Sequence, residues 1–211
     1  MKILVFSDTH LTEVFEKNKY FYLKNLIDGV DKVIINGDFW DGRMTSFSVF
    51  VNSRWKKLFP LLKRKKTVYI YGNHDPKEYC DHRVNLFSIH QTDKYLYKNG
   101  AGNFIIQHGK SSLPFSLVPK QIYTPLLKVS DFFDCRMTKY MGKNSHLWGI
   151  LINKIMKQKK KNGFFSIYAD THYAEFDPAC NFANTGFIRY GFAQYIMIEN
   201  KKILIKEEKY E

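Results

Sequence analysis

The stretch Ile3-Leu4-Val5-Phe6-Ser7-Asp8-Thr9-His10 decides the fold, because four apolar residues run directly into small, acidic and histidine residues. Continuous apolar runs of this length are typical of strands that are buried on both faces. The same pattern returns four times, at 33–35 before Asn36-Gly37-Asp38, at 68–71 before Gly72-Asn73-His74-Asp75, at 104–106 before Gln107-His108-Gly109, and at 164–168 before Ala169-Asp170-Thr171-His172. We therefore predict five buried strands, each followed by polar residues at its carboxyl end.

The segments between these runs predict how helices and strands alternate. Residues 14–27 and 47–62 are compatible with helices, which gives a β-α-β-α-β order over the first three strands. Two hairpins are expected, one joining 95–97 to 103–106 and one joining 193–198 to 202–206. Residues 111–161 contain no clear strand pattern and predict a helical insertion, interrupted by three prolines. We find no internal repeat and no linker, so we expect one domain over 1–211.

Length and composition predict a folded protein that stays in the cytoplasm. Of the 211 residues, 45% are hydrophobic and 17% aromatic, which excludes a disordered or fibrous class. The sequence has no run of about 18 or more apolar residues, and its first residues lack the pattern of a signal peptide. Three widely spaced cysteines without a Cys-x-x-Cys pair argue against a disulfide framework or a thiolate zinc site.

The formal net charge of +13 leaves two interpretations open. It predicts an acidic partner, such as nucleic acid, an anionic membrane surface or a phosphorylated substrate. Alternatively, it reflects a lysine-rich composition that faces solvent, because 27 of the 33 basic residues are lysine and only six are arginine. Specific phosphate recognition favours the fork geometry of arginine, so the charge alone does not choose between the two.

The five polar clusters contain residue types that bind metal ions. Four of the seven histidines lie in the clusters, whereas His82, His90 and His146 lie outside them and are expected to be structural or surface residues. Each cluster alone is weak evidence, because a strand-end aspartate is often a helix cap and a buried histidine is usually a core residue. Together they predict a ligand site, since ligands collect outside the carboxyl ends of strands in α/β sheets.

The order of the clusters resembles the calcineurin-like metallophosphoesterase superfamily, whose pattern is D-x-H, G-D-x-x-D, G-N-H-D, a single H and G-H-x-H. The first four motifs are intact here, as Asp8-Thr9-His10, Gly37-Asp38-Phe39-Trp40-Asp41, Gly72-Asn73-His74-Asp75 and His108. The resemblance implies an α/β fold in which a β-sandwich of two mixed sheets is flanked by helices. It also implies two divalent metal ions, one held by Asp8, His10, Asp38 and His172 and the other by Asp38, Asn73, His108 and Asp170.

The fifth motif departs from the family pattern, because Ala169-Asp170 stands where Gly-His is usual. A carboxylate is a competent ligand, and its harder oxygen favours manganese or magnesium. We therefore expect two Mn²⁺ ions, with Fe, Zn or Mg as alternatives. The competing interpretation is that Asp170 points away and leaves the second site weak or empty.

Two such ions promote displacement at phosphorus by making water acidic and by neutralising the phosphoryl oxygens. The resemblance implies that His74 is the catalytic histidine, which stabilises developing charge or protonates the leaving oxygen. Asp75 would orient His74 or support the metal ligands from behind, and Asp41 is expected to support the site rather than to bind metal. Arg43 and Lys110 are close enough to the motifs to contact a substrate phosphate, or they are solvated surface charges.

Three features resemble the UDP-2,3-diacylglucosamine pyrophosphatase branch of the superfamily, namely Ser-Asp-Thr-His-Leu at 7–11, the aromatic pair Phe39-Trp40, and Asn184-Thr185-Gly186 before the last hairpin. This resemblance implies hydrolysis of a pyrophosphate bond in a lipid precursor, although His108-Gly109-Lys110 departs from the branch's usual His-Gly-Asp. The alternatives are a nuclease or nucleotide phosphodiesterase, which the basic charge favours, and a non-catalytic scaffold with the same fold.

The insertion provides a separate argument about location. Its apolar residues 147–152 and 155–156 are followed by lysines at 157 and 159–161. An apolar helix that ends in lysines can lie at a membrane surface and present an acylated substrate, so contact through 147–161 would make the protein peripheral at the inner membrane surface. The preferred interpretation is a helix whose apolar stripe covers the sheet, because core packing is the commoner source of such stripes.

Overall fold

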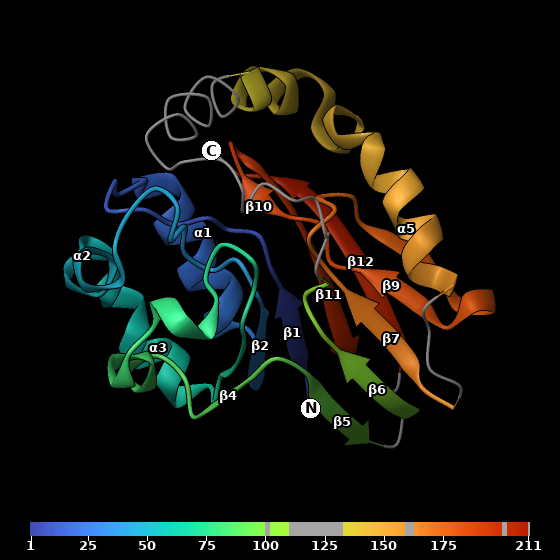
Figure 1. Ribbon diagram of the computed structural model, residues 1–211, viewed down its shortest axis with the longest axis horizontal. Helices are drawn as coiled ribbons and strands as arrows, with labels where there is room; N and C mark the ends of the chain where they lie inside the picture. Colours follow the sequence, from blue (N-terminus) through green and yellow to red (C-terminus); the bar gives the residue numbers. More distant parts are fainter. Residues whose placement is uncertain (100–101, 110–132, 159–162, 200–201, 211) are drawn as a thin grey trace.

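Two β-sheets form the centre of the computed structural model, which describes residues 1–99, 102–109, 133–158, 163–199 and 202–210 (Figure 1). The first sheet contains β1 (Ile3–Phe6), β2 (Lys32–Asn36), β3 (Val68–Ile70), β4 (His90–Thr92), β10 (Ile188–Arg189), β11 (Phe192–Glu199) and β12 (Lys202–Lys209). Its strand order is β10-β11-β1-β2-β3-β4, and β12 pairs with β11. The strands β1 to β4 are parallel, whereas β11 is antiparallel to its three neighbours.

The second sheet contains β5 (Tyr95–Asn99), β6 (Gly102–Ile106), β7 (Phe165–Tyr168), β8 (Glu175–Asp177) and β9 (Phe182–Asn184), in the order β5-β6-β7-β9-β8. Its three inner strands are parallel and its two edge strands are antiparallel to them. Both sheets are therefore mixed, and the five predicted buried strands correspond to β1, β2, β3, β6 and β7. The two predicted hairpins correspond to β5–β6 and β11–β12.

The two sheets share a core of mostly aliphatic side chains. Ile3 and Val5 of β1 pack in it with residues from β6 and β7, such as Ile106. Because successive side chains of a strand point to opposite faces, Leu4 and Phe6 lie instead in the core on the helical side of the first sheet. All four residues of β1 are fully buried, and this arrangement confirms the predicted sandwich of two mixed sheets flanked by helices.

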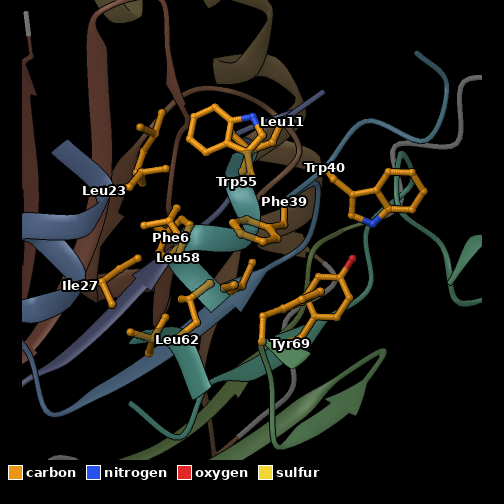
Figure 2. Close-up of a cluster of buried hydrophobic side chains, with 14 of the residues drawn as sticks. Phe6, Leu11, Leu23, Ile27, Phe39, Trp40, Trp55, Leu58, Leu62 and Tyr69 are labelled. Carbon is orange, nitrogen blue, oxygen red and sulfur yellow. The ribbon is translucent and has the colours of Figure 1, made fainter. Parts of the chain in front are cut away.

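Helices close the outer face of the first sheet. They are α1 (Lys17–Asp28), α2 (Phe47–Asn52) and α3 (Phe59–Arg64), joined by the 3-10 helix η1 (Arg54–Leu58). Figure 2 shows the resulting core, in which Leu23 and Ile27 of α1 lie with Leu62 of α3 and Phe6 of β1. Three further 3-10 helices are η2 (Lys77–Tyr79), η3 (His82–Leu86) and η6 (Pro178–Cys180).

The predicted helix over 47–62 is wrong as a single element, because Ser53 interrupts it. The backbone of Ser53 is extended, and its hydroxyl accepts a hydrogen bond from the backbone nitrogen of Trp55 at 3.3 Å. A serine side chain used in this way starts a new helical turn instead of continuing the previous one. Trp55 consequently turns into the core, where it is fully buried and donates from Nε1 to the carbonyl of Val14 at 3.1 Å. The first helix begins at Lys17, three residues later than predicted.

The described part of the predicted insertion is helical. Residues 133–141 form a helix, η5 (Gly142–His146) follows, and α5 (Trp148–Gln158) runs along the outside of the second sheet (Figure 1). Met156 of α5 packs there with Tyr168 and Phe182. Residues 110–132 and 159–162 lie outside the described part of the chain. Within the described residues, we find no helix with the length and apolar character needed to cross a membrane.

Candidate metal centre

The five polar clusters meet at the carboxyl ends of β1, β2, β3, β6 and β7. Backbone hydrogen bonds join their loops, from Asp8 N to Gly37 O at 3.2 Å and from Ala169 N to His108 O at 2.8 Å. The backbone nitrogen of Asp170 donates to Oδ2 of Asp8 at 3.3 Å and so connects the two sheets. The site therefore lies where both sheets end.

Asp8, His10 and His172 form the first group of potential metal ligands. Oδ1 of Asp8 lies 3.2 Å from Nε2 of His172 and 3.9 Å from Nε2 of His10. Nε2 of His10 also lies 3.6 Å from Oδ2 of Asp38. These are the four residues predicted for the first ion, and the fold brings them together from three different loops.

The residues predicted for the second ion also lie together. Oδ2 of Asp38 is 3.3 Å from Nε2 of His108, and Oδ1 of Asp170 is 3.7 Å from the same nitrogen. The terminal amide of Asn73 lies 2.9 Å from that nitrogen. With its nitrogen turned to the carboxylates, this amide donates to Asp38 at 3.0 Å and to Asp170 at 3.2 Å. The Asp170 carboxylate thus faces the site, and one oxygen of Asp38 borders both groups.

A cation fits these residues because it would satisfy atoms that lack hydrogen bonds. Oδ1 of Asp8 and Nε2 of His10 are buried and form no well-aligned hydrogen bond with any described residue. Buried polar atoms without such bonds are rare and costly. Five of the potential ligands also adopt a positive φ, between 44° and 73°, which is unusual for residues other than glycine. They are Asp8, His10, Asp38, Asp170 and His172.

The charge states of the site suit a cation. Burial alone would raise the pKa of Asp38, but His108, His74 and His10 beside it hold that pKa well below its usual range. Burial lowers the pKa of His10 to about 4, with a further contribution from the charge of His74. Ionised carboxylates and neutral imidazoles are the forms that bind metal.

The pKa of His108 is shifted in the opposite direction from that of His10, upward from its usual value. Burial would lower its pKa, but the carboxylate of Asp38 raises it well above the usual value, with smaller contributions from Asp8 and Asp170. A proton on His108 therefore balances three carboxylates. Metal binding would replace that proton, so ions and protons compete for this site.

Asp41 lies behind two histidines. Its Oδ2 is 3.3 Å from Nδ1 of His10, and its Oδ1 is 3.1 Å from Nδ1 of His74. Contacts of this kind fix the orientation of an imidazole ring. Burial would lower the pKa of His74, yet Asp38 and Asp41 raise it above its usual value. Asp41 therefore fixes the position of the His74 ring and favours its protonated form.

Asp75 supports a potential metal ligand from behind, which is the second of the two roles expected for it. Its carboxylate accepts hydrogen bonds from the backbone nitrogens of Asp38 at 2.9 Å, Phe39 at 2.7 Å and Gly72 at 2.7 Å. It thus holds the loop that carries Asp38, whereas Asp41 is the carboxylate that contacts His74. Gly72 is required in this loop, because a Cβ atom there would lie 2.1 Å from Oδ1 of Asp38.

Two residues that the sequence did not assign to the site lie beside it. The ring of His146, from the insertion, is 5.0 Å from that of His172 and 4.9 Å from that of Phe187. Burial, with the charges of His172 and Arg189, lowers the pKa of His146 to about 3. Arg189 also contributes to the low pKa of His10. Neither residue belongs to a motif. The one sequence signal near either of them is Asn184-Thr185-Gly186, which lies shortly before Arg189.

Four other residues were considered in the sequence, and the structure places three of them. Arg43 lies near enough to His74 for its charge to oppose protonation of that ring. His82 and His90 are exposed and lie outside the ligand groups that the described residues form. Lys110 lies outside the described residues, so its proposed contact with phosphate stays a prediction.

The loop at 184–186 supports the metal ligands from behind. Oγ of Ser7, next to Asp8, lies 2.6 Å from Oγ1 of Thr185 and donates to the carbonyl of Gly186 at 3.0 Å. Nδ2 of Asn184 donates to the carbonyl of Ala169 at 3.0 Å. This loop therefore links the ends of β1 and β7.

The two mixed sheets, with aspartate–histidine groups at their common edge, are the metallophosphoesterase fold. A family model described as calcineurin-like phosphoesterase matches residues 1–180, and the chain belongs to that family. No curated protein matches the sequence.

Several solved structures resemble the chain over nearly its whole length. An archaeal phosphodiesterase has 18% identity and a TM-score of 0.56, with 99% of both chains covered. The Escherichia coli phosphoesterase YfcE has 14% identity and a TM-score of 0.48, with 99% of both chains covered. Vps29 of Entamoeba histolytica, solved with zinc, has 12% identity and a TM-score of 0.46, again with 99% of both chains covered. At 18% identity the likeness to the archaeal phosphodiesterase supports the fold alone.

Proposed function

We propose that the chain is a metal-dependent hydrolase that cleaves a phosphodiester or pyrophosphate bond with two divalent cations. The observation that carries the proposal is Oδ2 of Asp38, which lies 3.6 Å from Nε2 of His10 and 3.3 Å from Nε2 of His108, between two ligand groups. When bound, two cations neutralise the phosphoryl oxygens and make water acidic near neutral pH. One would be held by Asp8, His10, Asp38 and His172, and the other by Asp38, Asn73, His108 and Asp170.

In this proposal the proton for the leaving group comes from His74. Its Nδ1 contacts Asp41, and the pKa of the ring is raised by Asp38 and Asp41 against the effect of burial. When the ring is protonated, its Nε2 can give a proton to the leaving oxygen. Arg43 and Arg189, whose charges reach the histidines of the site, are the candidates for contacts with phosphate.

For the substrate we propose a phosphorylated lipid precursor of the UDP-acylglucosamine type. Its support is the resemblance at 7–11, 39–40 and 184–186, together with a helical insertion whose His146 lies against His172. For the metal we propose Mn²⁺, because Asp170 supplies a charged oxygen where the family usually supplies imidazole nitrogen.

The test of the metal centre is metal content together with hydrolysis of bis(p-nitrophenyl) phosphate in added Mn²⁺. The parent should hold about two ions per chain and turn over this substrate. We expect Asp170→Ala to lose one ion and at least about 100-fold in activity. Asp93→Ala, which removes an exposed carboxylate elsewhere, is the matched control and should behave like the parent. A parent with one ion or none, and no turnover in Mn²⁺, Mg²⁺, Zn²⁺ or Fe²⁺, would contradict the proposal and favour the scaffold.

A second comparison tests the substrate class. The parent is given UDP-2,3-diacylglucosamine, the same sugar nucleotide without acyl chains, and a single-stranded oligonucleotide. A kcat/KM highest for the acylated compound supports the lipid precursor. Faster cleavage of the oligonucleotide would contradict the lipid-precursor substrate and indicate a nuclease. It would leave the two-cation mechanism unaffected.

A further inference from the structure

The insertion exposes an apolar surface on its outer side. We call this surface the outer insertion face, and its members are between 43% and 85% exposed, namely Phe133, Met137, Tyr140, Met141, Leu147, Trp148, Leu151 and Ile155. They are eight of the 18 exposed large hydrophobic residues in the described chain. Their concentration in 133–158 distinguishes them from the isolated apolar residues that any surface carries. Such a patch marks a surface that meets something other than water.

The spacing of these residues places them on one side of each helix. In the helix over 133–141 they recur at intervals of three and four residues, and in α5 Trp148, Leu151 and Ile155 follow the same spacing. Figure 1 shows the two helices following one another around the outer edge of the molecule. Each helix therefore presents an apolar stripe outward.

The buried residues on the inner side of α5 are Gly149, Asn153 and Met156, which attach the helix to the body of the protein. A Cβ atom at Gly149 would lie 2.4 Å from Cβ of Tyr173 and 2.6 Å from the carbonyl of Thr171, so the helix packs very closely there. Nδ2 of Asn153 donates to the carbonyl of Tyr173 at 3.2 Å and to Glu175 at 3.0 Å. The preferred interpretation, in which the apolar stripe covers the sheet, is therefore correct for Met156. It is wrong for Trp148, Leu151 and Ile155, which are at least half exposed.

The charge around the outer insertion face decides between possible partners. Residues 133–158 contain five basic residues and a single acidic one, Asp134. Two of the five form ion pairs, Lys143 with Glu207 and Lys157 with Glu175 and Asp177. Lys154 is exposed between Leu151 and Ile155 and forms no ion pair among the described residues. The centres of protein interfaces are depleted of lysine, whereas apolar residues mixed with lysine are typical of helices that lie on anionic bilayers.

We propose that the outer insertion face binds the surface of an anionic lipid bilayer. The exposed apolar side chains enter the headgroup boundary, and Lys154 beside them meets the negative lipid headgroups. Because His146 contacts His172 and the next two residues, Leu147 and Trp148, belong to the face, binding brings the candidate metal centre beside the bilayer. The proposal concerns adsorption to lipid and does not depend on hydrolysis by the site.

The test measures co-sedimentation of the full chain with vesicles of phosphatidylcholine alone and with vesicles that also contain phosphatidylglycerol. The parent should bind the anionic vesicles at least about fivefold more tightly, because a lysine near the surface contributes about fivefold. Leu151→Glu and Lys154→Glu should each weaken that binding by roughly tenfold or more. Leu86→Glu is the matched control, since Leu86 is 51% exposed and Leu151 is 50% exposed. It should bind like the parent.

Folding and self-association are followed in the same variants. Circular dichroism and hydrolysis of bis(p-nitrophenyl) phosphate should be unchanged by Leu151→Glu, which shows that lost vesicle binding is not lost structure. A parent that fails to bind phosphatidylglycerol vesicles, or a Leu151→Glu variant that binds them as the parent does, overturns the proposal. A parent dimer that Leu151→Glu converts to a monomer in gel filtration also overturns it, because the face would then belong to a second copy of the chain.

Discussion

The carboxylate of Asp41 contacts two histidines of the site. One oxygen contacts Nδ1 of His10, a potential metal ligand, and the other contacts Nδ1 of His74. Because Asp41 contacts no reacting atom, we regard it as a positioning residue. Its charge also raises the pKa of His74, so its effect on activity should depend on pH in a way that a purely structural role would not.

We expect Asp41→Asn to lower kcat by roughly 10- to 100-fold, the usual cost of removing such a supporting carboxylate. Asp41 helps raise the pKa of His74, so its removal lowers that pKa and His74 loses its proton at a lower pH. The basic limb of the pH–rate profile should therefore move to lower pH. Profiles with bis(p-nitrophenyl) phosphate check this, with Asp81→Asn on the surface as control. A variant whose profile keeps the parent's basic limb would contradict the role.

At the scale of elements, the attachment of α5 depends on close contact at one glycine. Gly149 faces the loop that carries His172, and a side chain there would meet Tyr173 and the carbonyl of Thr171. Asn153 continues the contact, since Oγ1 of Thr171 donates to its Oδ1 at 3.0 Å. The geometry of α5 is therefore coupled to that of a metal-ligand loop.

Gly149→Ala should destabilise the protein by about 1–3 kcal/mol, because the overpacked methyl group outweighs the gain of about 1 kcal/mol in helix propensity. Urea unfolding measures the difference. Gly29→Ala is the matched control, since Gly29 has an ordinary φ of −75° and a Cβ atom there would be 3.5 Å from its nearest neighbour. If Gly149→Ala were as stable as the control, α5 would not be packed against the loop as described.

Strands with a continuous apolar run could be predicted from the sequence, and the shortest strands could not. The residues of β1 form a continuous apolar run and were identified correctly, whereas β4, β8, β9 and β10 are only two or three residues long and carry no measurable period. The break at Ser53 was missed because it depends on one side-chain hydrogen bond.

The candidate site was predictable to the extent that it lies in contiguous motifs. All seven predicted ligands follow strands, and parallel strands bring their carboxyl ends together regardless of the details of packing. The contact of His146 with His172 joins residues 26 positions apart through the insertion, and the choice of Asp41 over Asp75 as the partner of His74 depends on loop geometry. Such contacts arise from tertiary packing, which motif spacing does not encode.

At the scale of the whole molecule, the candidate metal centre joins the two sheets. Loops after β1, β2 and β3 in the first sheet carry Asp8, His10, Asp38 and Asn73, and loops after β6 and β7 in the second sheet carry His108, Asp170 and His172. Each proposed ion would therefore be bound by residues of both sheets. Hydrogen bonds also join the two sheets at this edge, from Asp170 N to Asp8 at 3.3 Å and between Nδ1 of His108 and the carbonyl of Asn36 at 2.7 Å.

Removal of metal by a chelator should consequently loosen both sheets at their common edge and lower the melting temperature. Each ion at about a hundredfold excess over its Kd stabilises the protein by about 2.7 kcal/mol. Two ions therefore contribute about 5 kcal/mol, which corresponds to roughly 10–20 °C for a chain of this size. Hydrogen exchange should speed up together in peptides covering 7–11 and 169–173 and return to its former rate when Mn²⁺ is restored. Peptides covering α3, which packs on the far side of the first sheet, serve as the internal control. A change confined to the loops of one sheet would mean that the ions do not bridge the two.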